Sequence, residues 1–178
     1  MNQRSFGNCT LRVQEGDITD LEVEAFVFAC RDDLELGTGF GTAISMRGGP
    51  KIQEELRTIG HCAKGDAVVT RAGDLKASYI IHANGPKFQE TELENKLAAA
   101  TRASLVRARE RKVKNVAFPA LCSGFYGVSA DLCAKVMLQT ACDEVQRHQA
   151  PAEVIFCLRD ERELGPFRAE LAKLEVRP

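Results

Sequence analysis

Short segments of alternating or unbroken apolar residues predict β-strands along this chain. A regular alternation covers residues 9–16, and longer apolar runs fill 23–30 and 115–120. Unbroken runs are typical of strands whose two faces are both buried, as in a parallel sheet. About six strands are predicted in this way: 9–16, 23–30, 66–73, 77–85, 115–120 and 152–158.

A second spacing, in which apolar residues recur every three or four positions, predicts helices between the strands. It is longest over 91–112, where Leu93, Leu97 and Ala100 fall on one face. Ser129 stands before a similar segment and is a favoured residue at the start of a helix. The predicted helices cover 42–49, 50–60, 91–112, 129–148 and 161–174.

Strands that alternate with helices predict an α/β fold. We expect a three-layer α/β/α sandwich with a mixed, mostly parallel central sheet. A chain of 178 residues fits one domain, so we expect a single domain over 1–178 with its core at about 9–174. In such sheets ligands bind where strands end and the next helices begin.

The overall composition narrows the classes of function. Charged residues make up 28% and the net charge is -1, so general binding to nucleic acid is not expected. No apolar run approaches the ~20 residues that span a bilayer. The first residues lack a signal-peptide core, so we expect no membrane association. Seven cysteines without a C-x-x-C pair indicate reduced thiols and a cytoplasmic protein.

Two glycine-rich segments stand at predicted strand ends, and each precedes a predicted helix. One covers residues 37–41, and the other reads Cys-Ser-Gly-Phe-Tyr-Gly at 122–127. Glycine lets main-chain N–H groups approach an anion, and helix N-termini attract phosphate. Two such loops facing each other would hold a diphosphate without lysines, whereas the alternative is a pair of tight turns. Cys122 begins a loop before a helix, which lowers a thiol pKa, so a nucleophilic role is a further alternative for it.

Three stretches of the sequence together resemble a known family. They are VQEGDIT at 13–19, the block from GGPKIQEELRTIG to IIHANGP at 48–86, and VAFPALCSGFYG at 116–127. They are similar to motifs of the macrodomains, which bind ADP-ribose, and the similarity extends roughly from Leu11 to Leu174. The resemblance implies a macrodomain fold and, as partner, ADP-ribose or an ADP-ribosylated protein.

The resemblance also implies roles for particular residues. Asp17 would accept a hydrogen bond from the adenine amino group, with the main chain of Ile18 beside the ring. The alternative for Asp17 is an Asx turn or a helix cap. Tyr126 and Phe40 would lie by the distal ribose, and their alternative is lid or core packing. The residues implied to bind the ligand are Asp17, Ile18, Gly37, Thr38, Gly39, Phe40, Gly41, Cys122, Ser123, Gly124, Phe125, Tyr126, Gly127 and Arg159.

Arg159 stands at the end of the last predicted strand, where the family often has an aromatic residue that stacks on adenine. A guanidinium also stacks flat on a base, with a gain of about 1 kcal/mol. A shift of one or two residues in this comparison would place Phe156 or Leu158 there instead. The alternative for Arg159 is a solvated pair with Asp160 or Glu161.

The chain departs at two places from the family members that hydrolyse ADP-ribosyl bonds. Those members usually read Asn-Ala-Ala-Asn after the second strand, whereas residues 28–31 here read Phe-Ala-Cys-Arg. Many also carry an aspartate at the place of Gly41. We therefore expect a recognition module for ADP-ribose or ADP-ribosyl groups. The candidates left for a catalytic role are Arg31, Asp32 and Asp33.

Two other classes of function stay open. One is a hydrolase with non-standard residues, which removes ADP-ribose from modified proteins or deacetylates O-acetyl-ADP-ribose. The other is a different nucleotide function, such as a nicotinamide-dependent oxidoreductase. We expect no cofactor and no metal site, because the pair His61-Cys62 has no further ligands in its pattern. His82 ends an apolar strand and is expected to be a core residue, and the protein is expected to be a monomer.

Overall fold

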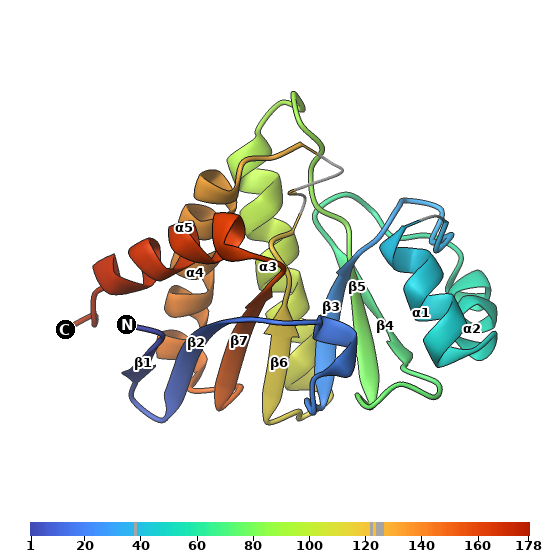
Figure 1. Ribbon diagram of the computed structural model, residues 1–178, viewed down its shortest axis with the longest axis horizontal. Coiled ribbons are helices and arrows are strands. Elements are labelled where there is room, and N and C mark those ends of the chain that lie inside the picture. The colour runs from blue at the N-terminus through green and yellow to red at the C-terminus, as the bar shows by residue number, and fades with distance from the viewer. Residues whose placement is uncertain (38, 122, 124–126) are drawn as a thin grey trace.

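The computed structural model of the protein describes residues 1–37, 39–121, 123 and 127–178. The strands, in chain order, are β1 (Gln3–Phe6), β2 (Cys9–Glu15), β3 (Ala25–Ala29), β4 (Ala67–Arg71), β5 (Tyr79–Ala83), β6 (Asn115–Phe118) and β7 (Glu153–Leu158). The described residues form a seven-stranded sheet in the order β1-β2-β7-β6-β3-β5-β4 (Figure 1).

The sheet is mixed and mostly parallel, as predicted. The five strands from β2 to β5 in this order run parallel to one another, and β1 and β4 are antiparallel edge strands. The sequence predicted about six strands and missed β1. Only Phe6 of this strand is buried, so the strand shows no alternation that a pattern could reveal.

Helices cover both faces of the sheet, which confirms the three-layer sandwich (Figure 1). Along β3, Ala25 and Val27 belong to one apolar cluster, whereas Phe26 and Phe28 belong to the other. The first cluster contains residues of α3, α4 and α5, and the second contains residues of α1 and α2. The helices are α1 (Phe40–Gly48), α2 (Lys51–Ile59), α3 (Leu93–Glu110), α4 (Ala130–His148) and α5 (Glu161–Lys173).

Local capping explains where several helices begin. Ser129 accepts a hydrogen bond from the Leu132 N–H, as predicted for the start of α4. Asp160 accepts from the Arg162 and Glu163 N–H groups at the start of α5. Within the described ranges, no helix combines the length and the apolar character needed to cross a membrane.

Four adjacent parallel strands determine where a ligand site can form. Because β2, β7, β6 and β3 are neighbours with one direction, their carboxyl ends meet at the same edge of the sheet. A short 3₁₀ helix, η1 (Ile18–Asp20), follows β2 at this edge, α1 follows β3 after a loop, and α5 follows β7. This edge is the expected place for a ligand in an α/β sheet.

Candidate functional site

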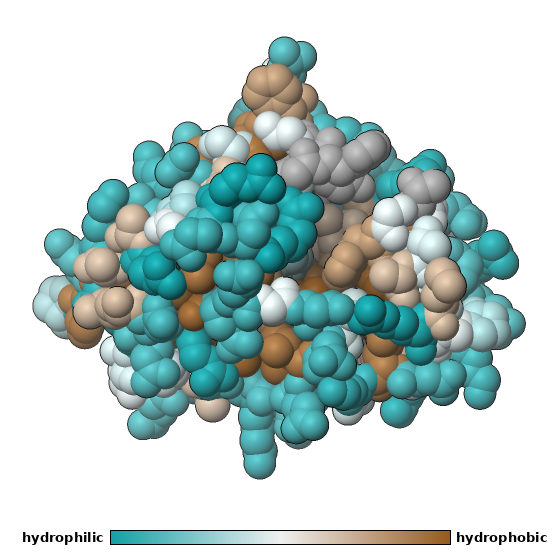
Figure 2. All heavy atoms as spheres, viewed as in Figure 1, coloured by the Kyte–Doolittle hydropathy of each residue, from teal (hydrophilic) through white to brown (hydrophobic). Residues whose placement is uncertain are grey.

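A cleft of about 830 Å³ opens at the carboxyl ends of β2, β7, β6 and β3. Segments that follow all four strands line it, together with the first turns of α1 and α5. In Figure 2, hydrophobic atoms are visible on this side of the molecule between polar groups. The predicted ligand-binding residues in its described lining are Asp17, Ile18, Gly37, Gly39, Phe40, Gly41, Ser123 and Arg159.

Some predicted residues do not line the described part of the cleft. Gly127 has a φ of 76° and lies in a separate groove, where an added Cβ would be 3.2 Å from the Cβ of Phe88. The remaining predicted positions lie outside the described residues: Thr38, Cys122, Gly124, Phe125 and Tyr126.

The first glycine segment adopts backbone angles that favour glycine. Gly37 and Gly39 both have a φ of 66°, and Gly39 is the N-cap of α1. Because Gly39 has no side chain, it supplies no side-chain cap for the first turn. Among the described residues, the first N–H groups of this helix, those of Phe40 and Gly41, have no acceptor, so they are available to an anion or solvent at the cleft.

Gly41 is required by a close approach of two backbone segments. A Cβ added there would lie 1.7 Å from the carbonyl oxygen of Leu36, well inside any van der Waals contact. In this backbone, position 41 therefore has no space for a side chain. The sequence resemblance matches this position to an aspartate of hydrolytic macrodomains.

Two aromatic rings form an apolar part of the cleft next to this helix start. Phe28 and Phe40 stack with ring centroids 5.7 Å apart, and the rings of Phe28 and His82 meet edge to face with centroids 6.0 Å apart. Phe28 is nearly buried, whereas Phe40 is 42% exposed. Phe28 is larger than the asparagine that hydrolytic family members usually carry at this place. It still does not fill the cleft, since the volume of about 830 Å³ is the space left beside its side chain.

Asp17 is the N-cap residue of η1 and borders the cleft. Its Oδ1 accepts from the Thr19 N–H at 3.0 Å and from the Thr19 hydroxyl at 2.6 Å. Its Oδ2 accepts from Arg47 Nη1 at 2.8 Å. These bonds, that of the Thr19 hydroxyl first, lower the pKa of Asp17 below its ordinary value of 3.8. The capping interpretation of Asp17 is thus confirmed, and the same carboxylate also faces the site.

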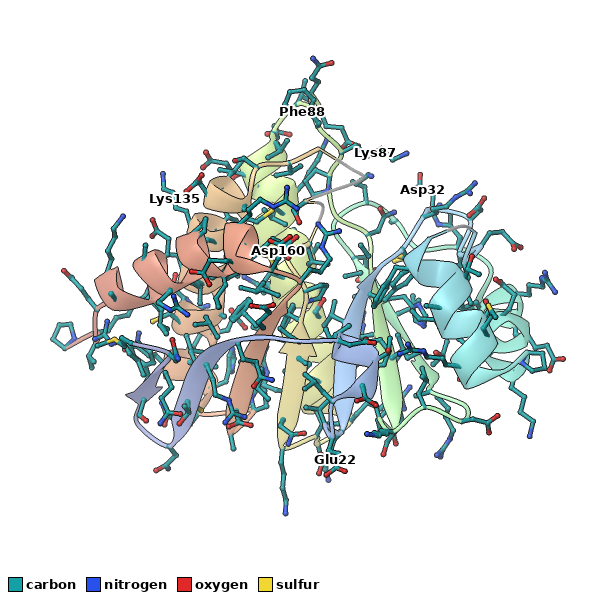
Figure 3. All side chains as sticks on the ribbon, viewed as in Figure 1. Glu22, Asp32, Lys87, Phe88, Lys135 and Asp160 are labelled. Atoms are coloured by element: carbon teal, nitrogen blue, oxygen red, sulfur yellow. The ribbon has the colours of Figure 1, made fainter. Side chains whose placement is uncertain are left out.

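Arg159 pairs with Glu163, a residue that no sequence pattern singled out. Its Nη2 donates to Glu163 Oε1 at 2.6 Å, so the alternative of a solvated pair with Asp160 or Glu161 is wrong. Asp160 instead caps α5, at the place labelled in Figure 3. Arg159 lies between the end of β7 and the N-cap of α5, so no helix periodicity signalled its pair with Glu163.

Glu163 also reaches the second glycine segment. Ser123 Oγ lies 3.0 Å from Glu163 Oε1. Burial raises the pKa of Glu163, but the hydrogen bonds from Arg159 and Ser123 outweigh burial, so this pKa lies below its ordinary value of 4.5. The carboxylate is therefore charged at neutral pH.

The three catalytic candidates are arranged differently from one another. Arg31 lines the cleft and donates to Asp33 Oδ2 at 2.9 Å. Asp32 accepts from Asn84 Nδ2 at 2.7 Å, and this bond lowers the pKa of Asp32 below 3.8. Asp32 and Asp33 are absent from the described lining of the cleft, and Figure 3 shows Asp32 on the loop after β3.

Three arginines and no lysine stand in the described lining. Each of them pairs with a carboxylate: Arg31 with Asp33, Arg47 with Asp17, and Arg159 with Glu163. The glycine-rich pattern predicted a diphosphate held without lysines. It gave no signal for Arg47, whose place depends on tertiary packing. Within the described ranges, no cluster of three or more histidine, cysteine or acidic side chains is arranged to hold a metal ion.

Comparisons with known proteins agree with this architecture. A macrodomain of Oceanobacillus iheyensis with ADP has a TM-score of 0.91 and 25% identity, with 96% of this chain and 94% of that chain covered. A mutant of the same macrodomain with ADPR has a TM-score of 0.89 and 26% identity, with 96% of each chain covered.

Proteins related in sequence align with nearly the whole chain. A macro domain-containing protein of Caldanaerobacter subterraneus subsp. tengcongensis is 40% identical over 171 residues, which are 93% of this chain and 97% of that protein. An uncharacterized protein of Sulfurisphaera tokodaii is 37% identical over 92% of this chain and 93% of its own length. The family model of the Macro domain matches residues 27–137. The chain therefore belongs to the macro domain family.

Proposed function

We propose that this protein binds ADP-ribose, free or attached to a protein, and acts as a recognition module. One observation carries the proposal. The first glycine segment, Ser123 of the second, Asp17 and Arg159 border one cleft at the carboxyl ends of parallel strands. The volume of about 830 Å³ lies within the usual range for small-molecule sites.

Each part of the cleft suits one part of the ligand. The N–H groups at the start of α1 that have no acceptor among the described residues suit the diphosphate, and Ser123 of the second glycine segment also lines the cleft. Asp17 and Ile18 suit the adenine edge, and Arg159 suits its face. Phe40, stacked on Phe28, would form a wall beside the distal ribose. The Oceanobacillus iheyensis macrodomain structures with ADP and with ADPR support a ligand of this class.

The arginines add to the main-chain groups in this proposal. The Arg31 guanidinium lies next to the first glycine segment, since a Cβ on Gly37 would be 3.7 Å from its Nη1. A bound phosphate would share this guanidinium with Asp33. Charge-assisted hydrogen bonds of this kind are about twice as strong as neutral ones, so Arg31 would strengthen binding at the diphosphate or the distal ribose.

We favour recognition over hydrolysis because of two local arrangements. The position of Gly41 has no space for a carboxylate side chain, and the Arg31 guanidinium is engaged by Asp33. Water attack at the anomeric carbon needs a group that positions or activates the water. Asp32, held by Asn84, is oriented by a structural bond instead.

A calorimetric titration with ADP-ribose tests the proposal. We expect one saturable site per chain. In a parallel incubation with an ADP-ribosylated protein, we expect the modification to stay in place. A titration without heat of binding would refute ADP-ribose binding, whereas rapid release of ADP-ribose would refute recognition as the main function.

A further inference from the structure

One buried carboxylate, that of Glu163, connects two walls of the cleft. Glu163 lies in the first turn of α5 and is only 6% exposed. Its Oε1 accepts from Arg159 Nε at 3.0 Å and from Arg159 Nη2 at 2.6 Å, and Ser123 Oγ lies 3.0 Å away. Its Oε2 accepts from the main-chain N–H of Arg159 at 3.0 Å. Both carboxylate oxygens are thus used, and their partners come from two separate segments.

The hydroxyl of Ser123 has two acceptors within reach. It lies 3.0 Å from the carbonyl oxygen of Ala120 and 3.0 Å from Glu163 Oε1. A hydroxyl has one proton, and a charged carboxylate is the stronger acceptor. The proton of Ser123 therefore favours Glu163, which links the segment after β6 to the start of α5.

The side chain of Arg159 is held although it is exposed. It is 67% exposed, and an arginine at such a site ordinarily samples many rotamers. The guanidinium donates two hydrogen bonds to Glu163 Oε1, and the main-chain N–H of Arg159 donates a third to Glu163 Oε2. These bonds fix both the guanidinium and the backbone of Arg159. An ion pair with a buried partner that also makes hydrogen bonds keeps its geometry better than a pair of exposed side chains.

We propose that Glu163 is a positioning residue that makes the Arg159 end and the Ser123 end of the cleft act as one unit. This inference rests on the proposed function, in which Arg159 meets the base and Ser123 belongs to the diphosphate loop. Glu163 itself would not touch the ligand. It sets the plane of the Arg159 guanidinium and the place of Ser123 together, so the loss of either partner releases the other.

The chemistry of the site requires a carboxylate of this length. Glutamine has the same shape, but it is neutral and carries an NH₂ group in place of one oxygen. It therefore loses the acceptor for the Arg159 main-chain N–H, and its remaining oxygen accepts only weaker, uncharged bonds from Arg159 and Ser123. The negative charge also lies in the first turn of α5, where the helix dipole favours an anion. Glu161 lies in the same turn, pairs with Arg168 at 3.2 Å and is exposed, which makes it a matched control for charge at this helix end.

A set of double-mutant cycles tests the inference. ADP-ribose affinity is measured for Ser123→Ala, Arg159→Ala and the double variant, first with Glu163 present and then with Glu163→Gln. With Glu163 present, we expect the double variant to lose less affinity than the product of the single losses, by about threefold or more. With Glu163→Gln, we expect the losses to multiply. Glu163→Gln alone should weaken binding about tenfold, and Glu161→Gln should leave it unchanged.

Each result has a distinct meaning. Losses that multiply with Glu163 present, or equal coupling in both backgrounds, would overturn the positioning role while ADP-ribose binding stands. A purely structural role would lower affinity or melting temperature without removing the coupling. If Glu163→Gln fails to fold, the first cycle decides alone, because it needs only the native Glu163. If the unmodified protein does not bind ADP-ribose, the proposed function and this inference both fail.

Discussion

The carboxylate of Asp17 accepts hydrogen bonds inside the protein and still borders the cleft. One oxygen takes both bonds from Thr19, and the other takes a bond from Arg47. Each carboxylate oxygen has two lone pairs, so Oδ2 retains one acceptor position. The bonds that hold η1 in place therefore also orient the group that we assign to the adenine edge.

Replacing Asp17 with alanine should affect binding more than folding. We expect Asp17→Ala to weaken ADP-ribose binding about tenfold, because a hydrogen bond to a charged acceptor is lost. We also expect a decrease of about 1 kcal/mol in the free energy of unfolding from the lost cap. Calorimetry and urea unfolding measure the two effects.

Asp20→Ala is the matched control for this change. Asp20 lies in the same short helix, and its carboxylate is exposed and pairs with Lys76 at 3.0 Å. This variant should bind ADP-ribose as the unmodified protein does. Equal affinities for all three proteins would show that Asp17 serves only the fold.

At the scale of elements, the start of α1 is formed by backbone that approaches backbone. Gly41 lies against the carbonyl of Leu36, and Thr42 Oγ1 donates to the carbonyl of Gly37 at 3.1 Å. These contacts fold the first glycine segment back onto its own helix. Gly39, Phe40 and Gly41 at this helix start line the cleft, so the phosphate site that we propose and the helix start are one feature.

A single methyl group at Gly41 should therefore disturb both stability and binding. We expect Gly41→Ala to lower the free energy of unfolding by about 1–3 kcal/mol, because overpacking forces the backbone apart. We also expect ADP-ribose affinity to fall. Urea unfolding and calorimetry give the two values.

Met46→Ala serves as the control on the same helix. Met46 is 81% exposed, so its loss should change neither quantity. If Gly41→Ala bound ADP-ribose as tightly as Met46→Ala, the start of α1 would not hold the diphosphate.

At the scale of the whole molecule, one titratable group lies within the sheet core beneath the cleft. His82 on β5 is fully buried and shares a hydrogen bond of 2.9 Å with Thr70 through Nε2. Its Nδ1 has no hydrogen-bond partner among the described residues. Burial lowers the pKa of His82 from 6.5 to about 3.

This histidine should make the protein sensitive to mild acid. In the unfolded chain His82 binds a proton near pH 6.5, whereas in the folded protein it stays neutral down to about pH 3. Its contribution to stability is therefore complete above pH 6.5 and decreases as the pH falls below it. We expect a loss of about 1.2 kcal/mol between pH 6 and 5 from this one group.

Urea unfolding at several pH values between 5 and 7.5 measures the effect, with His82→Gln as the comparison. The glutamine variant should be less stable at pH 7.5 but should show a flatter pH dependence. The same slope in both proteins would mean that His82 does not control the acid sensitivity.

The layers of the molecule could be predicted from the pattern of the chain, and the links between its loops could not. Buried strands and amphipathic helices repeat a period that depends only on neighbours in sequence, so the parallel sheet was predictable. β1 escaped because three of its four side chains are not buried. The contacts of Arg47 with Asp17, and of Glu163 with Ser123, join residues 30 and 40 positions apart, and no periodicity encodes them.

The comparison of ADP-ribose with AMP tests the two-loop site most directly. AMP has the adenine and one phosphate, so it would occupy only part of the cleft, whereas ADP-ribose would reach both glycine segments and the Phe28–Phe40 wall. Calorimetry should show that ADP-ribose binds at least about tenfold more tightly than AMP, since the second phosphate adds charge-assisted hydrogen bonds. Equal affinities for the two ligands would contradict a diphosphate held between two loops.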